Sequence, residues 1–350
     1  MERSGEDNMQ KEITKYGKLL NEQGQLAHPG WARHPVMKYV RKDIKANPLR
    51  IKEWDYYLIT DGKRGLALTV ADNSYMGMYS ASWLNFEEPC ETTKSVMTVL
   101  PMGRTGLPAS SAEGDTGFKN GRIDIQFCNN GRERRLYCSF SGFRKKETLE
   151  AAVILKEEPQ ESMVIMTPYA EDPHAFYYNQ KINCMKAVGF VSLGSEKYRF
   201  DESAFGVLDW GRGVWTYANT WYWASASGML DEHTFGFNLG YGFGDTSAAS
   251  ENVLFYDGRV HKLDRIEFLI PQENGKDAFM NPWKITSSDG RFEALFRPVL
   301  NRQSDTNVLL IESDQNQVFG RFSGKAELDD GEILTFRDFF GFAEKVRNRW

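Results

Sequence analysis

Short β-type segments separated by tight-turn dipeptides recur along most of the chain and leave little room for helices. Residues 122–129 show the pattern clearly, because Ile123, Ile125 and Phe127 alternate with polar residues as in a half-buried strand. Asn130-Gly131, which follows, is a strong hairpin signal. Further turns are marked by Asp61-Gly62, Asp257-Gly258, Asp289-Gly290 and Asp330-Gly331. We therefore predict an all-β chain of antiparallel strands, with less than about one-fifth helix.

Breaks in this rhythm indicate the domain organisation. Residues 1–50 carry turn signals without strand periodicity and are predicted to form an N-terminal arm. The β pattern begins near Trp54, and residues 168–186 interrupt it with two prolines. A length of 350 residues is comfortable for two domains. We place two β domains of similar size at residues 51–185 and 186–350.

Two segments depart from the strand pattern. Residues 101–120 are rich in Gly, Pro and Ser without periodicity, and their length predicts a functional loop or lid. Residues 340–350 are predicted to end the chain as a short helix that exposes Glu344, Lys345 and Arg347.

Composition and charge argue against several classes of protein. The net charge of -5 lacks the basic footprint of a nucleic-acid-binding protein. No window approaches the ~20 apolar residues of a membrane helix, and no signal peptide is visible, so we expect a cytoplasmic location. The four cysteines form no CxxC pair, so a disulfide framework is not expected. The five histidines lack metal-ligand spacing, and we predict neither metal nor cofactor.

The most unusual stretch runs from Asp209 to Gly228 and contains four tryptophans. Trp221 and Trp223 are two residues apart, so on a strand they face the same side. Asp209 and Arg212 place opposite charges beside bulky apolar surface, where each needs a partner. We predict that they pair with each other at the rim of an aromatic pocket, with Asp209 as a general acid or base. The alternative is a buried ion pair with a structural role.

A second candidate carboxylate is Glu251, which follows the glycine-rich residues 236–245. Two carboxylates in different environments can divide acid and base roles, whereas a structural Glu251 would cap backbone N–H groups. The glycines are not a phosphate loop, because no Gly-Lys-Ser/Thr follows them. The predicted catalytic residues are Asp209, Glu251 and Arg212. The predicted ligand-binding residues are Trp54, Tyr178, Lys181, Trp215, Trp221, Trp223, Asn238 and Asn252.

From about residue 12 to Trp350 the chain resembles a bacterial family known as domain of unknown function 2804. The resemblance rests on five motifs: IKEWDYY at 51–57, FYYNQK at 176–181, DWGRG at 209–213, GFGD at 242–245 continuing to Glu251-Asn252, and GFAE at 341–344. A remoter likeness is to the two-domain lipocalin-like proteins of the AttH and carotenoid 1,2-hydratase group. In that group an Asp-x-x-Trp-Gly element precedes a Trp-x-Trp strand.

Two elements of this chain are similar, Asp209-Trp210-Gly211 and Trp221-Tyr222-Trp223, although the spacing differs and no histidine follows Asp209. This resemblance implies a fold of two lipocalin-like antiparallel barrels packed together, with a cavity at the mouth or junction. It also implies a hydrophobic or amphipathic small molecule as the partner.

Three functions remain open from the sequence. The first is a cofactor-independent hydratase, cyclase or isomerase that uses carboxylate acid-base chemistry in an aromatic pocket. The second is a lipocalin-like carrier of the same ligands, and the weakest is a glycosidase. A carboxyl group with a raised pKa that faces the ligand favours catalysis, whereas a purely apolar cavity favours carriage. The sequence does not indicate the oligomeric state.

Overall fold

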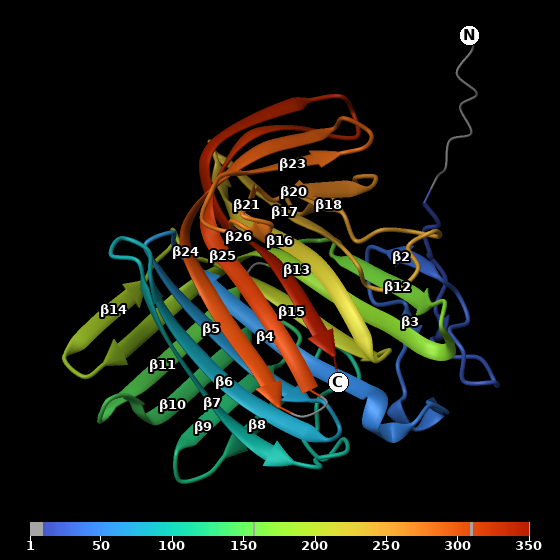
Figure 1. Cartoon of the computed structure of the whole chain (residues 1–350), viewed down its shortest axis with the longest axis horizontal. Helices are drawn as coiled ribbons and strands as arrows, with labels where there is room; N and C mark the ends of the chain where they lie inside the picture. Colours follow the sequence, from blue (N-terminus) through green and yellow to red (C-terminus); the bar gives the residue numbers. More distant parts are fainter. Residues whose placement is uncertain (1–9, 157, 309–310, 350) are drawn as a thin grey trace.

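The computed structural model describes residues 10–156, 158–308 and 311–349 (Figure 1). Strands make up 65% of the described residues and helix 2%. The helical elements within the described ranges are the 3-10 turns η1 (Arg41–Asp43) and η2 (Pro48–Arg50). The predicted all-β fold with little helix is confirmed. The predicted arm is described from residue 10 onward, and its first nine residues lie outside the described ranges.

The first sheet contains thirteen of the described strands and curls into a half-barrel. Its main path runs in the order β7 (Cys90–Val99), β6 (Met76–Asn85), β5 (Arg64–Asp72), β4 (Ile51–Thr60), β15 (Phe205–Val214), β13 (Asp172–Leu193), β11 (Glu147–Lys156), β10 (Arg134–Arg144), β9 (Ile123–Asn129) and β8 (Thr116–Lys119). Beside this path lie β12 (Met163–Tyr169), β14 (Glu196–Phe200) and β2 (Gly30–Ala32).

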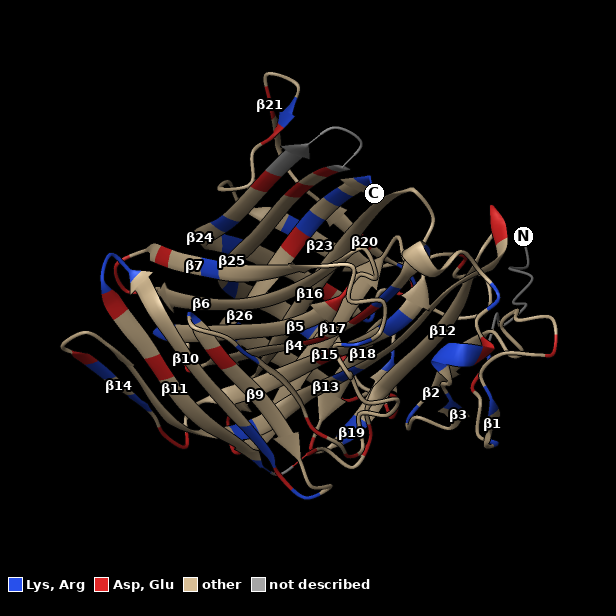
Figure 2. Cartoon of the chain, turned by 90° about the horizontal axis from the view of Figure 1, so that it is seen from below, with Lys and Arg blue, Asp and Glu red and all other residues tan. Residues whose placement is uncertain are grey.

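The second sheet contains nine of the described strands and forms the other half-barrel. Its order is β19 (Arg259–Lys262), β18 (Val253–Tyr256), β17 (His233–Tyr241), β16 (Ala218–Leu230), β26 (Ile333–Arg349), β25 (Ile311–Glu327), β24 (Phe292–Val308), β23 (Trp283–Ser287) and β20 (Ile266–Leu269). Two short pairs complete the fold: β1 (Gly17–Lys18) with β3 (Met37–Lys38), and β21 (Gln272–Glu273) with β22 (Lys276–Asp277). Figure 2 shows basic and acidic positions interspersed along the strands and turns.

The chain changes sheets between Val214 and Ala218. The domain boundary expected after residue 185 falls inside β13. Strand β15, which follows, still belongs to the first sheet and pairs with both β4 and β13. The loss of alternation around residues 175–185 has a physical reason, because these residues are buried on both faces of β13. A strand covered on both faces has no polar side and can resemble a break in the β pattern.

The two half-barrels share an extensive buried layer. One hydrophobic core includes side chains of the first sheet together with Trp223, Phe243 and Phe342 of the second half, whereas a separate core fills the second half-barrel. We call the shared region the inter-sheet layer. It contains the side chains of β4, β13 and β15 that face β16, β17 and β26, the side chains of these three strands that face back, and Trp215, Phe243 and Glu251. The fold therefore buries β15 at all ten positions.

Residues 101–115 form an irregular loop, and β8 occupies the end of the segment that was predicted to be a loop. Arg212 donates to the Pro108 carbonyl at 2.7 Å, and Arg134 donates to the Ser111 carbonyl at 2.8 Å. Two buried side chains of the first sheet thus hold this loop in place. Its role as a lid stays a prediction.

The predicted C-terminal helix is wrong, because residues 333–349 form strand β26 between β16 and β25. Phe342, Glu344 and Val346 are buried, whereas Lys345 and Arg347 are more exposed, which is the period of a strand. Glu344 was expected on the surface and lies in the inter-sheet layer instead. Trp350 lies outside the described residues.

Gly211 in β15 allows a close approach between the strand and an aromatic ring. A Cβ atom at this position would lie 2.0 Å from the ring of Trp54. No larger residue fits there without moving Trp54, whose indole N–H donates to Asp209 at 3.1 Å.

We expect Gly211→Ala to lower the free energy of unfolding by roughly 1–3 kcal/mol, because overpacking displaces the Trp54 ring. Urea denaturation measures the change. The control is Gly121→Ala, where an added Cβ meets nothing within 4 Å and a change within about 0.5 kcal/mol is expected. Equal stability of the two variants would contradict this packing.

Candidate functional site

Strand β15 presents a different charged residue on each of its two faces. Asp209 is directly opposite Lys181 of β13 and Tyr56 of β4, so these three side chains share the face that lines the inter-sheet layer. Arg212 is three residues further along, so it points to the other face, toward the interior of the first half-barrel.

Asp209 is the centre of a buried polar group. Its Oδ1 atom lies 2.8 Å from Lys181 Nζ and accepts a hydrogen bond from Asn179 Nδ2 at 2.6 Å. Its Oδ2 atom accepts the indole N–H of Trp54 at 3.1 Å. The Lys181 side chain is 1% exposed, so its charge depends on this partner.

The predicted pairing of Asp209 with Arg212 is therefore wrong. Arg212 pairs with Asp55 at 3.0 Å and donates to the carbonyl of Trp54 at 2.7 Å. Asp209 and Arg212 are close in sequence, but β15 is a continuous extended strand, so their side chains point to opposite faces. Tyr178, predicted to bind ligand, also lies on the Arg212 face, and its hydroxyl donates to the Met37 carbonyl at 2.8 Å.

The tryptophans of β16 face the same side, as predicted. Trp221 lies 5.3 Å from the ring of Trp215, and Trp223 lies 6.1 Å from that of Tyr56. Lys181 Nζ is 4.0 Å from the Trp223 ring centroid, a cation–π distance. These rings cover the Asp209–Lys181 pair from the side of the second sheet.

A second aromatic group lies beside the first and extends the layer toward Glu251. Trp54 packs against Trp215 and Tyr177, with ring centroids 5.7 and 6.3 Å away. Phe243 stacks on Tyr177 at 4.7 Å and lies 5.8 Å from Trp221. Among the predicted ligand-binding residues, four tryptophans and Lys181 thus come together around Asp209.

Glu251 is 3% exposed, and neither of its carboxyl oxygens makes a well-aligned hydrogen bond to a described residue. The Tyr177 hydroxyl nevertheless interacts with this carboxyl group. Burial raises the pKa of the carboxyl group to about 7, and the charge of Asp209 acts in the same direction, while Lys181, Lys262 and the Tyr177 hydroxyl lower this pKa. Near neutral pH a large fraction of Glu251 therefore carries a proton.

Asn238 and Asn252 serve mainly to fix this region. Asn238 accepts the Trp223 indole N–H at 2.7 Å and donates to the Glu251 carbonyl at 2.9 Å. Asn252 accepts the Gly240 N–H at 2.6 Å. Both amides hold the backbone and rings around the Glu251 carboxyl group.

A third carboxyl group, Glu344, lies in the same layer. It accepts hydrogen bonds from Trp221 Nε1 at 3.0 Å and Gln317 Nε2 at 3.1 Å. Burial raises its pKa to about 7, although the Trp221 hydrogen bond opposes the shift. From the sequence, Glu344 was expected on the surface. The apolar residues Phe342 and Val346, two positions away on either side, are the signal that could have indicated its buried face.

Two further buried polar atoms of the layer, Asn179 Oδ1 and Trp215 Nε1, have no hydrogen-bond partner within the described ranges. The Tyr177 hydroxyl interacts with Glu251 but makes no well-aligned hydrogen bond. Buried polar atoms are normally paired, so these atoms of the layer require an explanation. Tyr177 and Asn179 belong to the FYYNQK motif, but the sequence did not reveal which of its residues face Asp209.

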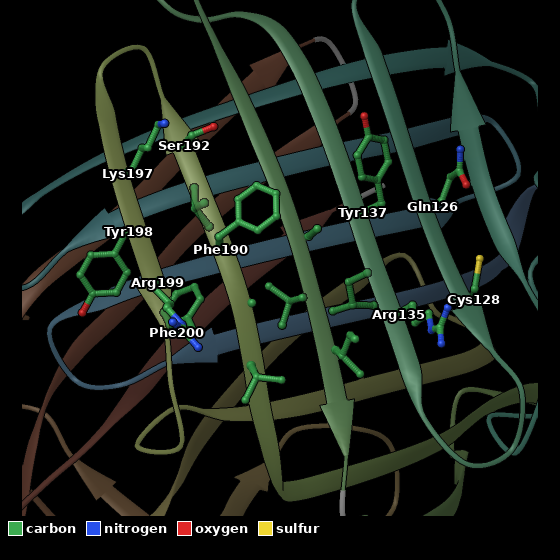
Figure 3. A pocket seen from close by; sticks show the side chains of 17 residues that line it. Gln126, Cys128, Arg135, Tyr137, Phe190, Ser192, Lys197, Tyr198, Arg199 and Phe200 are labelled. Atoms are coloured by element: carbon green, nitrogen blue, oxygen red, sulfur yellow. The ribbon is translucent and has the colours of Figure 1, made fainter.

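A groove on the surface of the first sheet lies away from this layer. It has a volume of about 1120 Å³, lies on β9, β10, β11, β13 and β14 and includes the exposed rings of Phe190 and Tyr137 (Figure 3). A pocket at the junction of the domains therefore stays a prediction.

No group of three His, Cys, Asp or Glu residues that could hold a metal ion occurs in the described part of the chain. None of its helices has the length and apolar character needed to cross a membrane.

A model of a protein family described as domain of unknown function (DUF2804) matches residues 10–350. The chain belongs to the DUF2804 family. No curated protein matches its sequence.

Several solved structures resemble the chain. A protein from Nitrosomonas europaea described as an AttH candidate has a TM-score of 0.50 at 12% identity, over 88% of this chain and 96% of the other. Kievitone hydratase from Nectria haematococca has a TM-score of 0.47 at 11% identity, over 85% and 88%. CghA with Sch210972 has a TM-score of 0.48 at 10% identity, over 95% and 97%. The first similarity supports a lipocalin-like fold for this DUF2804 member.

We expect Asp209→Asn to lower the free energy of unfolding by about 3–5 kcal/mol, because it leaves the Lys181 ammonium buried without a counter-charge. Adding Lys181→Met to this variant should recover part of the loss. Chemical denaturation of the two single variants and the double variant measures the coupling.

The same cycle on the exposed pair Lys284–Glu293, 2.8 Å apart, is the control and should give a coupling of about 0–1 kcal/mol. Additive effects of the Asp209 and Lys181 substitutions would show that the buried pair does not stabilise the layer.

Stability should also depend on pH through Glu344. Its pKa rises from 4.5 to about 7 on folding, so between these values only the unfolded state loses the proton. The free energy of unfolding should therefore fall as pH rises from about 5 to 7, by roughly 3 kcal/mol for this carboxyl group. In Glu344→Gln this contribution disappears, and denaturation curves across the range should show a shallower fall. An unchanged pH slope would contradict the assigned environment.

Proposed function

We propose that the inter-sheet layer is the active site of a cofactor-independent enzyme that moves protons on a hydrophobic or amphipathic small molecule. The reaction class is addition or removal of water, cyclisation or isomerisation. The observation that carries the proposal is the Glu251 carboxyl group, which is buried beside Tyr177, has a pKa raised to about 7 by burial and makes no well-aligned hydrogen bond to a described residue.

The surroundings of Glu251 support a proton donor. A carboxyl group that is protonated near neutral pH can donate a proton to a substrate. With a pKa of about 7, the same group can give up its proton and take up another one at neutral pH. A structural carboxylate would be expected to use its oxygens in hydrogen bonds, as Glu344 does with Trp221 and Gln317.

Asp209 supplies the complementary role. Its carboxylate is held by Lys181, Asn179 and Trp54 and is positioned to accept a proton. In a hydration, Glu251 gives a proton to one carbon of a double bond, and water adds to the other carbon while Asp209 takes its proton. Proton exchange with solvent then restores both carboxyl groups. The two environments differ, which is how one site divides acid and base roles.

The aromatic rings suit the ligand and the intermediate. Ring faces bind flat or branched apolar ligands, and they attract a developing positive charge by about 0.5–2 kcal/mol each. Trp215 contributes an indole N–H without a hydrogen-bond partner among the described residues, and Tyr177 contributes a hydroxyl beside Glu251. Both groups suit a polar atom of the ligand. A carrier would need the same rings, but it would have no use for a buried acid with a pKa of about 7.

We expect Glu251→Gln to reduce proton transfer to the ligand by about 10²–10⁴-fold while ligand binding persists, because the amide keeps the shape and cannot donate an acidic proton. Native mass spectrometry first identifies the ligand that co-purifies with the protein. Incubation in D₂O then measures deuterium entering carbon positions of that ligand. The transfer rate should fall as pH rises through about 7, because Glu251 loses its proton.

The control is Glu113→Gln, which lies on an exposed part of the loop and should retain the full rate. Ligand that binds in the wild-type protein without gaining deuterium would identify a carrier and refute the enzymatic proposal.

A further inference from the structure

The backbone on either side of Glu251 is held by an unusual number of hydrogen bonds. Lys262 Nζ donates to the Ser250 carbonyl at 2.6 Å and to the Asn252 carbonyl at 2.9 Å. The same ammonium group lies 3.2 Å from the Ser250 hydroxyl. One side chain thus binds the residue before Glu251 and the residue after it.

Other groups complete this anchoring from separate parts of the chain. Gln10 in the N-terminal arm accepts the Ser250 N–H at 2.7 Å and donates to the Leu263 carbonyl at 2.8 Å. Asn252 Nδ2 donates to the Asp264 carbonyl at 2.9 Å. The arm, β17 and the segment after β19 therefore all fix residues 250–252.

This arrangement contrasts with the carboxyl group of Glu251 itself. Its neighbours in the chain use their carbonyls, hydroxyl and amide in hydrogen bonds, whereas its own two oxygens make no well-aligned hydrogen bond to described residues and face the Tyr177 hydroxyl. A restrained backbone that carries a weakly bound acid is the pattern expected of a preorganised reactive group.

We propose that Lys262 is a positioning residue that holds the Glu251 carboxyl group in place and controls its proton affinity. The inference concerns the same site as the proposed function. Only its expected effect on catalysis rests on that function. Lysine fits the role because its ammonium group has three donors, and the structure supplies three oxygen acceptors around it.

The charge of Lys262 also acts on Glu251 directly. Burial lowers the pKa of Lys262 to about 7 and the charge of Glu251 opposes the shift, so the two groups titrate in the same pH range and each depends on the other. The charged groups that act on the carboxyl group are Lys181, Lys262 and Asp209, and the Tyr177 hydroxyl faces it as well. Lys262 and Lys181 lower the pKa of Glu251, and Asp209 raises it. Removing the Lys262 charge takes away one of the two cations that lower the pKa of Glu251, so this pKa must rise.

The experiment measures the protonation of Glu251 by infrared spectroscopy, without any ligand. The difference between spectra of the wild-type protein and Glu251→Gln isolates the carbonyl stretch of the protonated acid, and a pH titration gives its midpoint. We expect Lys262→Met to raise this midpoint by about one pH unit or more. Lys262→Arg keeps a cation throughout the titration and should hold the midpoint at or below the wild-type value.

Lys262→Gln serves as a second neutral variant that retains a hydrogen-bond donor, should Lys262→Met not fold. Its midpoint should also rise. The matched control is Lys284→Met, a partly exposed lysine outside the layer, which should leave the midpoint unchanged. A midpoint that stays constant in both neutral Lys262 variants would overturn the inference.

Deuterium transfer to the co-purified ligand then tests the catalytic consequence. Lys262→Met should lower the rate at least tenfold in the wild-type background and should change nothing further in the Glu251→Gln background. If Glu251→Gln itself retains full activity, the proposed function fails, while the infrared titration still decides whether Lys262 controls Glu251.

Discussion

The burial of strand β15 on both of its faces is the constraint on which the rest of the structure depends. Because side chains alternate along the strand, Asp209 points into one layer and Arg212 into the other, and both side chains are buried. A buried charge without a partner is strongly destabilising, so each must meet a counter-charge across the sheet. Lys181 and Asp55 provide these partners, and both lie on strands that pair with β15.

The two buried pairs divide the molecule into a structural side and a candidate reactive side. Arg212 uses its donors on Asp55 and on backbone carbonyls, including that of Pro108, so it fixes the first half-barrel and its loop. Asp209 instead lies among tryptophans and near two carboxyl groups with raised pKa values. Unpaired polar atoms gather on this side, and the proposed chemistry belongs there for that reason.

The sequence predicted the fold class well because alternation and Asp-Gly turns are local signals. It also predicted the common orientation of Trp221 and Trp223, since period two is a property of any strand. It failed where the answer depended on partners distant in the chain. Asp209 and Arg212 were paired because they are close in sequence, whereas the register of β13 and β4 decides their contacts. Glu344 was missed because charged residues near a chain end are usually exposed, and its burial follows from the pairing of β26 with β16 and β25.

The central claim is that a small molecule binds in the inter-sheet layer next to Glu251. A crystal structure of the protein with its co-purified ligand tests this most directly. The account predicts ligand density between the two sheets, with a ligand atom within about 3–4 Å of the Glu251 carboxyl group and contacts to the rings of Trp54, Trp215 and Tyr177. Ligand bound only in the outer groove beside Phe190 and Tyr137, with the inter-sheet layer packed as before, would contradict it.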